Sequence, residues 1–202
     1  MSQLSIPSPS VGAFHLGPLT IHIYALCILA GIVIAYIGGE RRYQACDGKQ
    51  EHFEELCTLG VIAGIIGGRL YHVITDHQLY FGPGRTWYHS LFIWQGGLGI
   101  WGAITLGGLA ILLYCRHKDI RFAPVADSLA PGILAAQAIG RLGNWFNQEL
   151  FGRPTSLPWG LEIDLAHRPA GYLQYATFHP TFLYELLWNL AGAAFLVWAD
   201  RR

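Results

Sequence analysis

The sequence predicts an all-α integral membrane protein with about five transmembrane helices. Hydrophobic residues make up 52% of the chain and charged residues only 13%, about half the charged share of a soluble domain. The chain also has 25 glycines and 7 tryptophans, which is typical of proteins that cross a membrane several times. Five apolar stretches approach the roughly 20 residues that a helix needs to cross the bilayer core. We expect the spans at residues 19–39, 56–75, 91–115, 125–146 and 182–199.

Residues 1–202 are expected to form a single transmembrane domain that begins with a short leader. The leader, residues 1–17, is polar and contains prolines and serines, so we expect an exposed leader rather than a domain. No basic segment precedes the first span, so we expect no cleaved signal peptide and expect this span to direct membrane insertion. Tyr24 lies in the first span, where an aromatic anchor at the membrane interface is the common explanation for a tyrosine.

The second span is rich in glycine. Gly60, Gly64 and Gly68 recur at four-residue spacing, and small residues at this spacing allow two helices to pack closely. Arg69 follows them within the apolar stretch. From the residues alone, both a snorkelling role and a functional role for Arg69 are open.

The third span contains a nucleotide-binding pattern that we reject. Residues 97–102, Gly-Leu-Gly-Ile-Trp-Gly, match the GxGxxG pattern of dinucleotide-binding proteins. However, residues 91–115 contain no charged side chain, and no strand–helix–strand pattern surrounds them. The glycines instead predict the close approach of a neighbouring helix or of a lipid headgroup.

Polar residues gather at the end of the fourth span, in residues 140–155. At helical spacing Arg141, Asn144 and Gln148 fall on one face, and lipid tails cannot satisfy such a polar stripe. Ionisable groups at this depth are costly and usually face a cavity or a partner. Snorkelling would explain a single arginine, but six polar groups among three glycines predict a functional site.

Residues 147–178 are predicted to lie outside the bilayer core. They contain three prolines and alternating apolar and acidic residues between Leu161 and Leu165. We expect a small arm or head on the membrane surface, with short strands. The sequence His179-Pro180-Thr181 then leads into the fifth span, where Glu185 and Asn189 share a helix face at i, i+4 spacing.

The distribution of lysine and arginine predicts the orientation. The loops 40–55 and 116–123 together with the end of the chain hold eight basic residues, and the other side holds three. The positive-inside rule then places the N-terminus outside, the C-terminus inside and residues 140–155 at the outer leaflet. The eight are Arg41, Arg42, Lys49, Arg116, Lys118, Arg121, Arg201 and Arg202, and the three are Arg85, Arg153 and Arg168.

Several functional classes lack support in the sequence. The formal net charge is zero, so there is no electrostatic case for nucleic acid. The four cysteines show no CxxC or zinc-like spacing, so neither disulfides nor a metal site are expected. Two alternatives to an enzyme are a non-catalytic lipid-binding protein and a small transporter, although the inverted repeats common in transporters are not found. A structural membrane subunit would explain the glycines but not the polar helix end.

Taken alone, the polar helix end predicts a site for an anionic or polar-headed ligand that enters from the membrane. Arg141 is permanently charged, and its planar guanidinium can donate two hydrogen bonds to a phosphate. Asn144, Asn147 and Gln148 offer donors for hydroxyl groups. Glu149 can fix an arginine or accept a hydrogen bond from a glycerol hydroxyl.

Residues 140–152 resemble the signature of the prolipoprotein diacylglyceryl transferase family of bacterial membrane enzymes. The signature runs Gly-Arg-x-Gly-Asn-(apolar)-(apolar)-Asn-x-Glu-x-x-Gly. This chain supplies its fixed positions as Gly140, Arg141, Gly143, Asn144, Asn147, Glu149 and Gly152. Weaker matches extend the resemblance over nearly the whole chain, at Tyr24, Gly67-Gly68-Arg69, Gly96-Gly97, Asp127 and His179-Pro180.

The resemblance implies a reaction in the bacterial cytoplasmic membrane, the first step of lipoprotein maturation. Phosphatidylglycerol would donate its diacylglyceryl group to the lipobox cysteine thiol of a prolipoprotein, forming a thioether and releasing glycerol phosphate. Such a transfer requires a thiolate and stabilisation of the departing phosphate, and neither requires a metal or an organic cofactor. The resemblance implies catalytic roles for Arg141, Glu149, His179 and Tyr24. It implies phosphatidylglycerol binding by Arg141, Asn144, Asn147, Gly152 and Arg69.

The chain departs from the family pattern at two places. Many members carry a histidine, a candidate base, before a glycine in the third span, whereas this chain has Trp101 before Gly102. His179 and Glu149 are candidates to replace that base, and a base that is not a side chain is also open. Members usually continue past the fifth span with two further helices and another arginine, so we expect this chain to be a fragment or a shortened relative.

Overall fold

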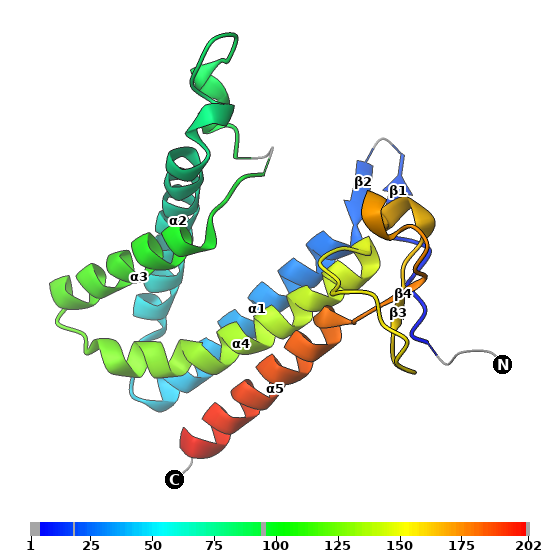
Figure 1. Cartoon of the computed structure of the whole chain (residues 1–202). Helices are drawn as coiled ribbons and strands as arrows, with labels where there is room; N and C mark the ends of the chain where they lie inside the picture. Colours follow the sequence, from blue (N-terminus) through cyan, green and yellow to red (C-terminus); the bar gives the residue numbers. More distant parts are fainter. Residues whose placement is uncertain (1–4, 18, 94–95, 201–202) are drawn as a thin grey trace. The chain divides into compact units, whose positions relative to one another are not determined.

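The computed structural model describes residues 5–17, 19–93 and 96–200. Within these ranges five helices are long and apolar enough to cross a membrane, which confirms the predicted all-α membrane class. The chain divides into two compact units, Met1–Arg41 with Asp127–Arg202 and Arg42–Ala126, so a single domain stays a prediction. The helices, labelled in Figure 1, are α1 (Ile23–Ala45), α2 (Gln50–Thr75), α3 (Ile100–His117), α4 (Phe122–Asn147) and α5 (Thr181–Asp200).

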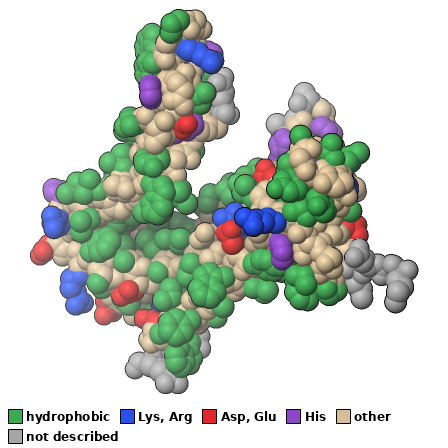
Figure 2. Space-filling model, in the orientation of Figure 1, with side chains coloured by type: hydrophobic (Ala, Val, Ile, Leu, Met, Phe, Trp, Pro, Cys, Tyr) green, Lys and Arg blue, Asp and Glu red, His purple; other side chains and the backbone are tan. Residues whose placement is uncertain are grey.

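Large apolar side chains are exposed on all five helices. Figure 2 shows hydrophobic side chains over much of the visible surface. Soluble proteins rarely expose so much contiguous apolar surface, whereas a bilayer would cover it. Each helix has a large apolar side chain with an exposed fraction between 55% and 80%. Examples, in helix order, are Ile32, Val61, Ile104, Ile133 and Trp188.

In the unit formed by Met1–Arg41 and Asp127–Arg202, α1 and α4 pack closely through glycines. A Cβ atom on Gly132 would lie 3.0 Å from Cα of Ala35, and one on Gly31 would lie 2.9 Å from the carbonyl oxygen of Ala136. Backbone atoms at these distances leave no room for a side chain. The two helices therefore approach backbone to backbone, as small residues allow.

The predicted head between α4 and α5 is folded around short strands. Strands β3 (Leu161–Glu162) and β4 (Thr177–Phe178) pair antiparallel, and the 3₁₀ turns η4 (Leu165–His167) and η5 (Ala170–Tyr172) lie between them. The rings of Trp145 on α4 and Phe182 on α5 stack with centroids 5.5 Å apart, so one core joins the head to both helices. The buried members of this core are Leu161, Ile163, Phe178 and Phe182.

The described residues before α1 form strand and bridge pairs that the sequence did not predict, although Phe14, Leu16 and other residues of this segment are exposed as expected. Strand β1 (Ala13–Leu16) pairs with β2 (Leu19–His22), and Ile6 pairs with Leu161 beside the head. The amide of Ile6 donates to the carbonyl of Gly160 at 2.8 Å, and Ile6 packs against the core of the head. The leader is folded because the edge of β3 satisfies its backbone and the core buries its apolar side chain.

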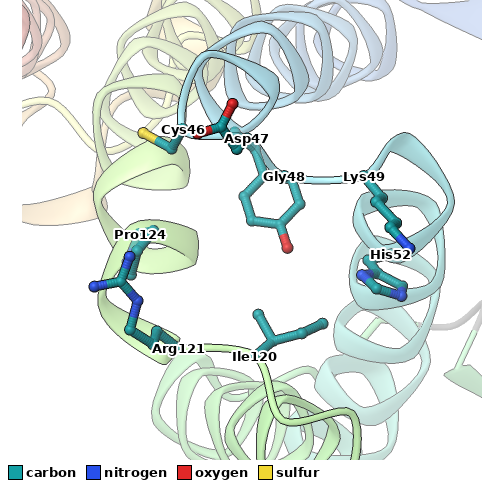
Figure 3. A pocket seen from close by; sticks show the side chains of 9 residues that line it. Cys46, Asp47, Gly48, Lys49, His52, Ile120, Arg121 and Pro124 are labelled. Atoms are coloured by element: carbon teal, nitrogen blue, oxygen red, sulfur yellow. The ribbon is translucent and has the colours of Figure 1, made fainter.

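The first span is shifted along the chain from its predicted place. Residues 19–22 form β2, so helix α1 begins at Ile23, and Tyr24 lies in its first turn. The helix continues to Ala45, and only residues 46–49, whose labels appear in Figure 3, separate it from α2. The predicted charged connection, residues 40–55, is therefore largely helical.

The third span is shorter than predicted, because α3 begins at Ile100 and not at residue 91. The 3₁₀ turns η1 (His77–Leu79) and η2 (Trp87–Leu91) lie between α2 and α3. Gly96 and Gly97 then have φ angles of +85° and +78°, which a right-handed helix cannot include. Residues 96–99 are thus an apolar loop, which hydropathy alone does not distinguish from an apolar helix.

In the unit Arg42–Ala126, glycines bring α2 and α3 into contact, as their spacing predicted. A Cβ atom on Gly67 would lie 2.3 Å from the carbonyl oxygen of Gly102, and one on Gly102 would lie 2.1 Å from that of Gly67. Gly68 meets the carbonyl oxygen of Gly99 at 3.3 Å in the same way. Two glycines of the rejected nucleotide-binding pattern, Gly99 and Gly102, therefore serve packing against α2.

Replacing Gly67 by alanine is expected to destabilise the protein, because the added methyl group would overlap the backbone of α3. Overpacking of this kind costs about 1–3 kcal/mol. The matched control is Gly108→Ala on α3, where an added Cβ meets nothing within 4 Å and the helix gains up to ~1 kcal/mol of propensity. Thermal unfolding in detergent measures both, and equal stability of the two variants would contradict the close packing.

Candidate active site

Helix α4 ends in a tight reversal that turns the signature residues back toward the helix. The φ angles of Gln148 and Leu150 are +52° and +54°, in the left-handed region that non-glycine residues rarely adopt. The amide of Glu149 donates to the carbonyl of Asn144 at 3.1 Å. This reversal places the Glu149 carboxylate beside the last turn of the helix.

Five polar side chains form a continuous chain of contacts, which we call the signature network. Nη1 of Arg141 donates to Oδ1 of Asn144 at 3.2 Å. Nδ2 of Asn144 and Nδ2 of Asn147 both donate to Oε1 of Glu149, at 3.0 and 3.1 Å. Nε of Arg141 forms an ion pair with Oε2 of Glu185 at 2.6 Å. The structure thus joins the four predicted residues of α4 and its reversal to a carboxylate on α5.

Arg141 retains donors that are free to bind a ligand. A guanidinium has five N–H groups, and the contacts of Arg141 with Glu185 and Asn144 use one on Nε and one on Nη1. Its other N–H groups have no hydrogen-bond partner among residues 5–17, 19–93 and 96–200. The side chain is 26% exposed, so it is partly accessible, and the Glu185 contact holds one edge of the guanidinium.

Tyr24 lies against the signature through Gly143. A Cβ atom on Gly143 would lie 2.5 Å from Cδ2 of the Tyr24 ring. Gly143 is buried and Tyr24 is 36% exposed, so the ring covers the helix backbone and one edge remains open. The glycine of the signature is required for this contact, because any side chain would displace the ring.

His179 and Gly152 lie together but outside the signature network. The amide of Gly152 donates to the carbonyl of His179 at 2.9 Å, and a Cβ on Gly152 would lie 2.9 Å from Cβ of His179. Nδ1 of His179 is 3.1 Å from the hydroxyl of Tyr184, which accepts from Nε1 of Trp159 at 3.1 Å. The structure therefore explains Gly152 by packing and gives His179 aromatic neighbours that the sequence did not indicate.

Gln148, which the sequence offered as a donor for a ligand, holds the head instead. Its Nε2 donates to Oδ2 of Asp164 at 2.6 Å, and its Oε1 accepts from the amide of Asp164 at 2.8 Å. Nε2 also contacts the carbonyl oxygen of Pro9 at 3.4 Å. Because Gln148 is buried and both ends of its amide are engaged, it fixes the reversal after α4.

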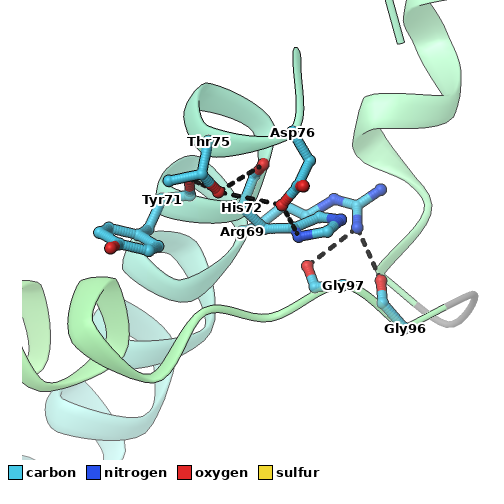
Figure 4. A network of polar contacts seen from close by, with 7 residues as sticks. All are labelled: Arg69, Tyr71, His72, Thr75, Asp76, Gly96 and Gly97. Atoms are coloured by element: carbon cyan, nitrogen blue, oxygen red, sulfur yellow. Dashed lines mark hydrogen bonds and ion pairs between the residues drawn. The ribbon is translucent and has the colours of Figure 1, made fainter. Parts of the chain in front are cut away.

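Arg69 belongs to the other unit and holds a loop (Figure 4). It is 7% exposed and makes four hydrogen bonds to backbone carbonyls. Nε donates to Ser90 at 2.6 Å, Nη2 to His89 at 2.8 Å, and Nη1 to Gly96 and Gly97 at 2.7 and 3.0 Å. Arg69 therefore has few donors left for a phosphate, in contrast to Arg141.

The predicted glycine pair 96–97 is explained by this loop. An added Cβ on Gly97 would lie 2.5 Å from Nε2 of His72 and 2.7 Å from Nη1 of Arg69. His72 is held in turn by Asp76, with 3.0 Å between Nδ1 and Oδ2 (Figure 4). Only a glycine can both adopt the positive φ and admit these two side chains.

Two further results concern chemistry at the site. Trp101, at the position of the family histidine, is 66% exposed. Among the residues that the structure describes, no group of three or more His, Cys, Asp or Glu side chains has an arrangement that would hold a metal ion. Sequence reasoning did not assign a role to Glu185, although a carboxylate inside an apolar span could have marked it as a partner for an arginine.

Arg69→Gln is expected to loosen the loop after η2 without unfolding the helices. Each hydrogen bond to a charged group contributes about 1.5–3 kcal/mol, so losing one or more should speed local opening roughly tenfold or more. Hydrogen exchange of the amides in residues 89–93 measures this effect. Arg85→Gln, which removes an exposed arginine of the same connection, is the control; equal exchange in both variants would contradict the loop-holding role.

The chain is similar to proteins with one shared name. A protein of Cutibacterium acnes named phosphatidylglycerol–prolipoprotein diacylglyceryl transferase is 88% identical over 202 residues, which are 100% of this chain and 68% of that protein. A Streptomyces coelicolor protein with this name and the number 2 is 54% identical over 100% of this chain and 64% of its own length. A Corynebacterium efficiens relative is 51% identical over 100% of this chain and 66% of its own length.

The match extends over nearly the whole chain, which spans about two thirds of the length of these curated relatives. A family model described as prolipoprotein diacylglyceryl transferase matches residues 11–202. This match and the identity to the relatives confirm the resemblance seen in residues 140–152. The chain belongs to the prolipoprotein diacylglyceryl transferase family.

Proposed function

We propose that this chain transfers the diacylglyceryl group of phosphatidylglycerol to the lipobox cysteine of a prolipoprotein, the first step of bacterial lipoprotein maturation. Diacylglyceryl transfer is the activity for which the family is named, and the Cutibacterium acnes relative is named for both substrates. The observation that carries the proposal is Arg141. It is fixed by Glu185 and Asn144 and keeps N–H donors that have no partner among the described residues.

The proposed reaction is an alkyl transfer. A base takes the proton of the cysteine thiol. The thiolate then attacks the carbon of the diacylglyceryl group that bears the phosphate ester. The new carbon–sulfur bond is a thioether, and the carbon–oxygen bond breaks with its electron pair going to the phosphate. The product that leaves is glycerol phosphate. Charge on the leaving phosphate rises as the bond breaks, so a fixed cation beside it lowers the barrier.

The signature network supplies the groups for this step. Arg141 donates its free N–H groups to the phosphate, and Asn144 and Glu185 hold the guanidinium in place. Oε1 of Glu149 orients both asparagine amides, so Asn144 and Asn147 stand beside the phosphate as further donors. Tyr24 borders the same last turn of α4 through its contact with Gly143.

The base has two candidates, and two of the predicted lipid contacts receive other roles. Glu149 and His179 both stay candidates for the base, since Glu149 is exposed and His179 is partly exposed. For Gly152 we propose a packing role beneath His179, and for Arg69 a role in holding the loop that contains Gly96 and Gly97.

One experiment separates this function from its alternatives. The purified chain is reconstituted with phosphatidylglycerol and a lipobox peptide, and the mass of the peptide is measured. A gain of one diacylglyceryl group is expected. A lipid-binding protein without chemistry would bind phosphatidylglycerol and leave the peptide mass unchanged, and a transporter would instead move lipid between leaflets.

Arg141→Lys is expected to reduce transfer about 10²-fold or more, by analogy with the loss of one oxyanion donor. Lysine keeps the positive charge but loses the planar fork, so a two-point contact with phosphate becomes a one-point contact. The matched control is Arg116→Lys, which changes an exposed arginine on α3. Both proteins are compared at equal amounts of folded protein in the membrane. Near-normal transfer by Arg141→Lys would remove the phosphate role and favour a snorkelling arginine.

We propose that the signature network faces the outer leaflet of the bacterial cytoplasmic membrane. The support is the eight-to-three asymmetry of basic residues, although Arg201 and Arg202 lie outside the described residues. This is the side on which a translocated precursor presents its cysteine.

The orientation is tested with single cysteines placed at exposed positions in a chain that lacks its own cysteines. A thiol reagent that does not cross membranes should label Ser10→Cys and Ser156→Cys in intact cells, and should not label Gln50→Cys. Permeabilised cells provide the control, since all three positions should then react. The reverse labelling pattern would overturn the proposed orientation.

A further inference from the structure

The unit Arg42–Ala126 contains a cavity that the proposed reaction does not use. Its volume is about 210 Å³, and it is lined by the turn after α1, the start of α2 and the turn that leads into α4. Its polar lining includes Lys49, His52 and Arg121, and Ile120 contributes an apolar wall. Figure 3 shows Lys49 and His52 on one side of the cavity, and Arg121 and Pro124 on the other.

The cavity lies where two helices begin. Helix α2 starts directly after Lys49, and α4 starts directly after Arg121. The first N–H groups of a helix have no acceptor within the helix and carry partial positive charge. Lys49 makes no side-chain capping bond at the start of α2, whose first turn carries the acidic Glu51, and α4 has no acidic residue in its first turn. The start of α4 therefore adds to the positive potential of the cavity, and Glu51 offsets the contribution of the start of α2.

The side chains of the cavity have the charge that an anion requires. Lys49 and Arg121 are positively charged, and His52 becomes so when it is protonated. Asp47 is the acidic residue in the lining. Neither Lys49 nor Arg121 forms an ion pair within residues 5–17, 19–93 and 96–200. Two cationic side chains therefore line one cavity, and neither has a carboxylate partner among the described residues.

We propose that this cavity binds a phosphate group, carried by an anionic lipid headgroup or by a soluble phosphate. Lysine and arginine together with helix N-termini are the groups that recognise phosphate in proteins. At about 210 Å³ the cavity is smaller than the roughly 300–1,000 Å³ of sites for whole small molecules, so it suits a phosphate with little attached. The turns that form it connect membrane-spanning helices, which places it at the level of lipid headgroups.

The inference is tested with lipids other than the proposed substrate. The purified chain in a neutral detergent is titrated with dioctanoyl phosphatidic acid and, separately, with dioctanoyl phosphatidylcholine, and bound lipid is counted by native mass spectrometry. The test variant is Lys49→Gln with Arg121→Gln. The matched control is Arg41→Gln with Arg116→Gln, which removes the same charge from exposed arginines outside the cavity. Any phosphatidic acid bound near Arg141 is common to all of these proteins.

The test variant is expected to bind phosphatidic acid at least about tenfold more weakly, and the control within about twofold of the unchanged chain. Lys49→Arg with Arg121→Lys should retain binding, since it keeps both charges. An equal loss in the test variant and the control, or no loss in either, would overturn the proposal. Competition by millimolar inorganic phosphate would identify a soluble phosphate as a ligand, and its absence would identify a lipid headgroup. Diacylglyceryl transfer should be unchanged in the test variant.

Discussion

The ion pair between Arg141 and Glu185 is the contact on which the candidate active site depends. A charged side chain in a membrane-spanning helix is costly unless it finds a partner, and Arg141 lies in the last two turns of α4. Glu185 provides that partner from α5, with 2.6 Å between Oε2 and Nε of the arginine. Helix α5 must therefore lie against the end of α4, and the stacked rings of Trp145 and Phe182 support the same approach from the head. The rest of the network builds on this placement. Asn144 accepts a hydrogen bond from the guanidinium that Glu185 fixes, and Glu149 accepts one from Asn144.

Arg69 is also an arginine in an apolar helix, but its hydrogen-bond donors are satisfied in another way. It too follows glycines on an apolar helix, but it is buried and donates to four backbone carbonyls rather than to a carboxylate. The carbonyls of Gly96 and Gly97 are available because both glycines adopt positive φ angles and turn the chain toward the arginine. The two arginines therefore differ in which donors remain free, and a residue count or a motif does not contain that information.

The sequence predicted what local rules determine. Hydropathy located five spans because a bilayer imposes both length and composition, and the spacing of Gly60, Gly64 and Gly68 indicated close packing of α2 because only small residues permit it; the contact of Gly67 with Gly102 was not predicted. It did not locate the start of α3, since an apolar loop and an apolar helix have the same hydropathy. It did not assign Gln148 to Asp164 or Arg141 to Glu185, because those pairs depend on how distant segments meet. It did not predict the pairing of Ile6 with Leu161 for the same reason, since the edge of β3 lies far along the chain.

The family signature can now be divided by physical role. Gly143 admits the ring of Tyr24, and Gly152 admits the backbone of His179, so these positions are fixed by packing. Arg141, Asn144 and Asn147 have polar atoms directed into one network, and their identity is set by hydrogen bonding. The two sets are interdependent, because the glycines bring α1 and the head against the end of α4 and so define the space that the polar groups share. The signature therefore acts as one geometric unit: a side chain added at Gly143 or Gly152 would displace the elements packed against the end of α4, while a substitution at a polar position would change the hydrogen bonds between elements that stay in place.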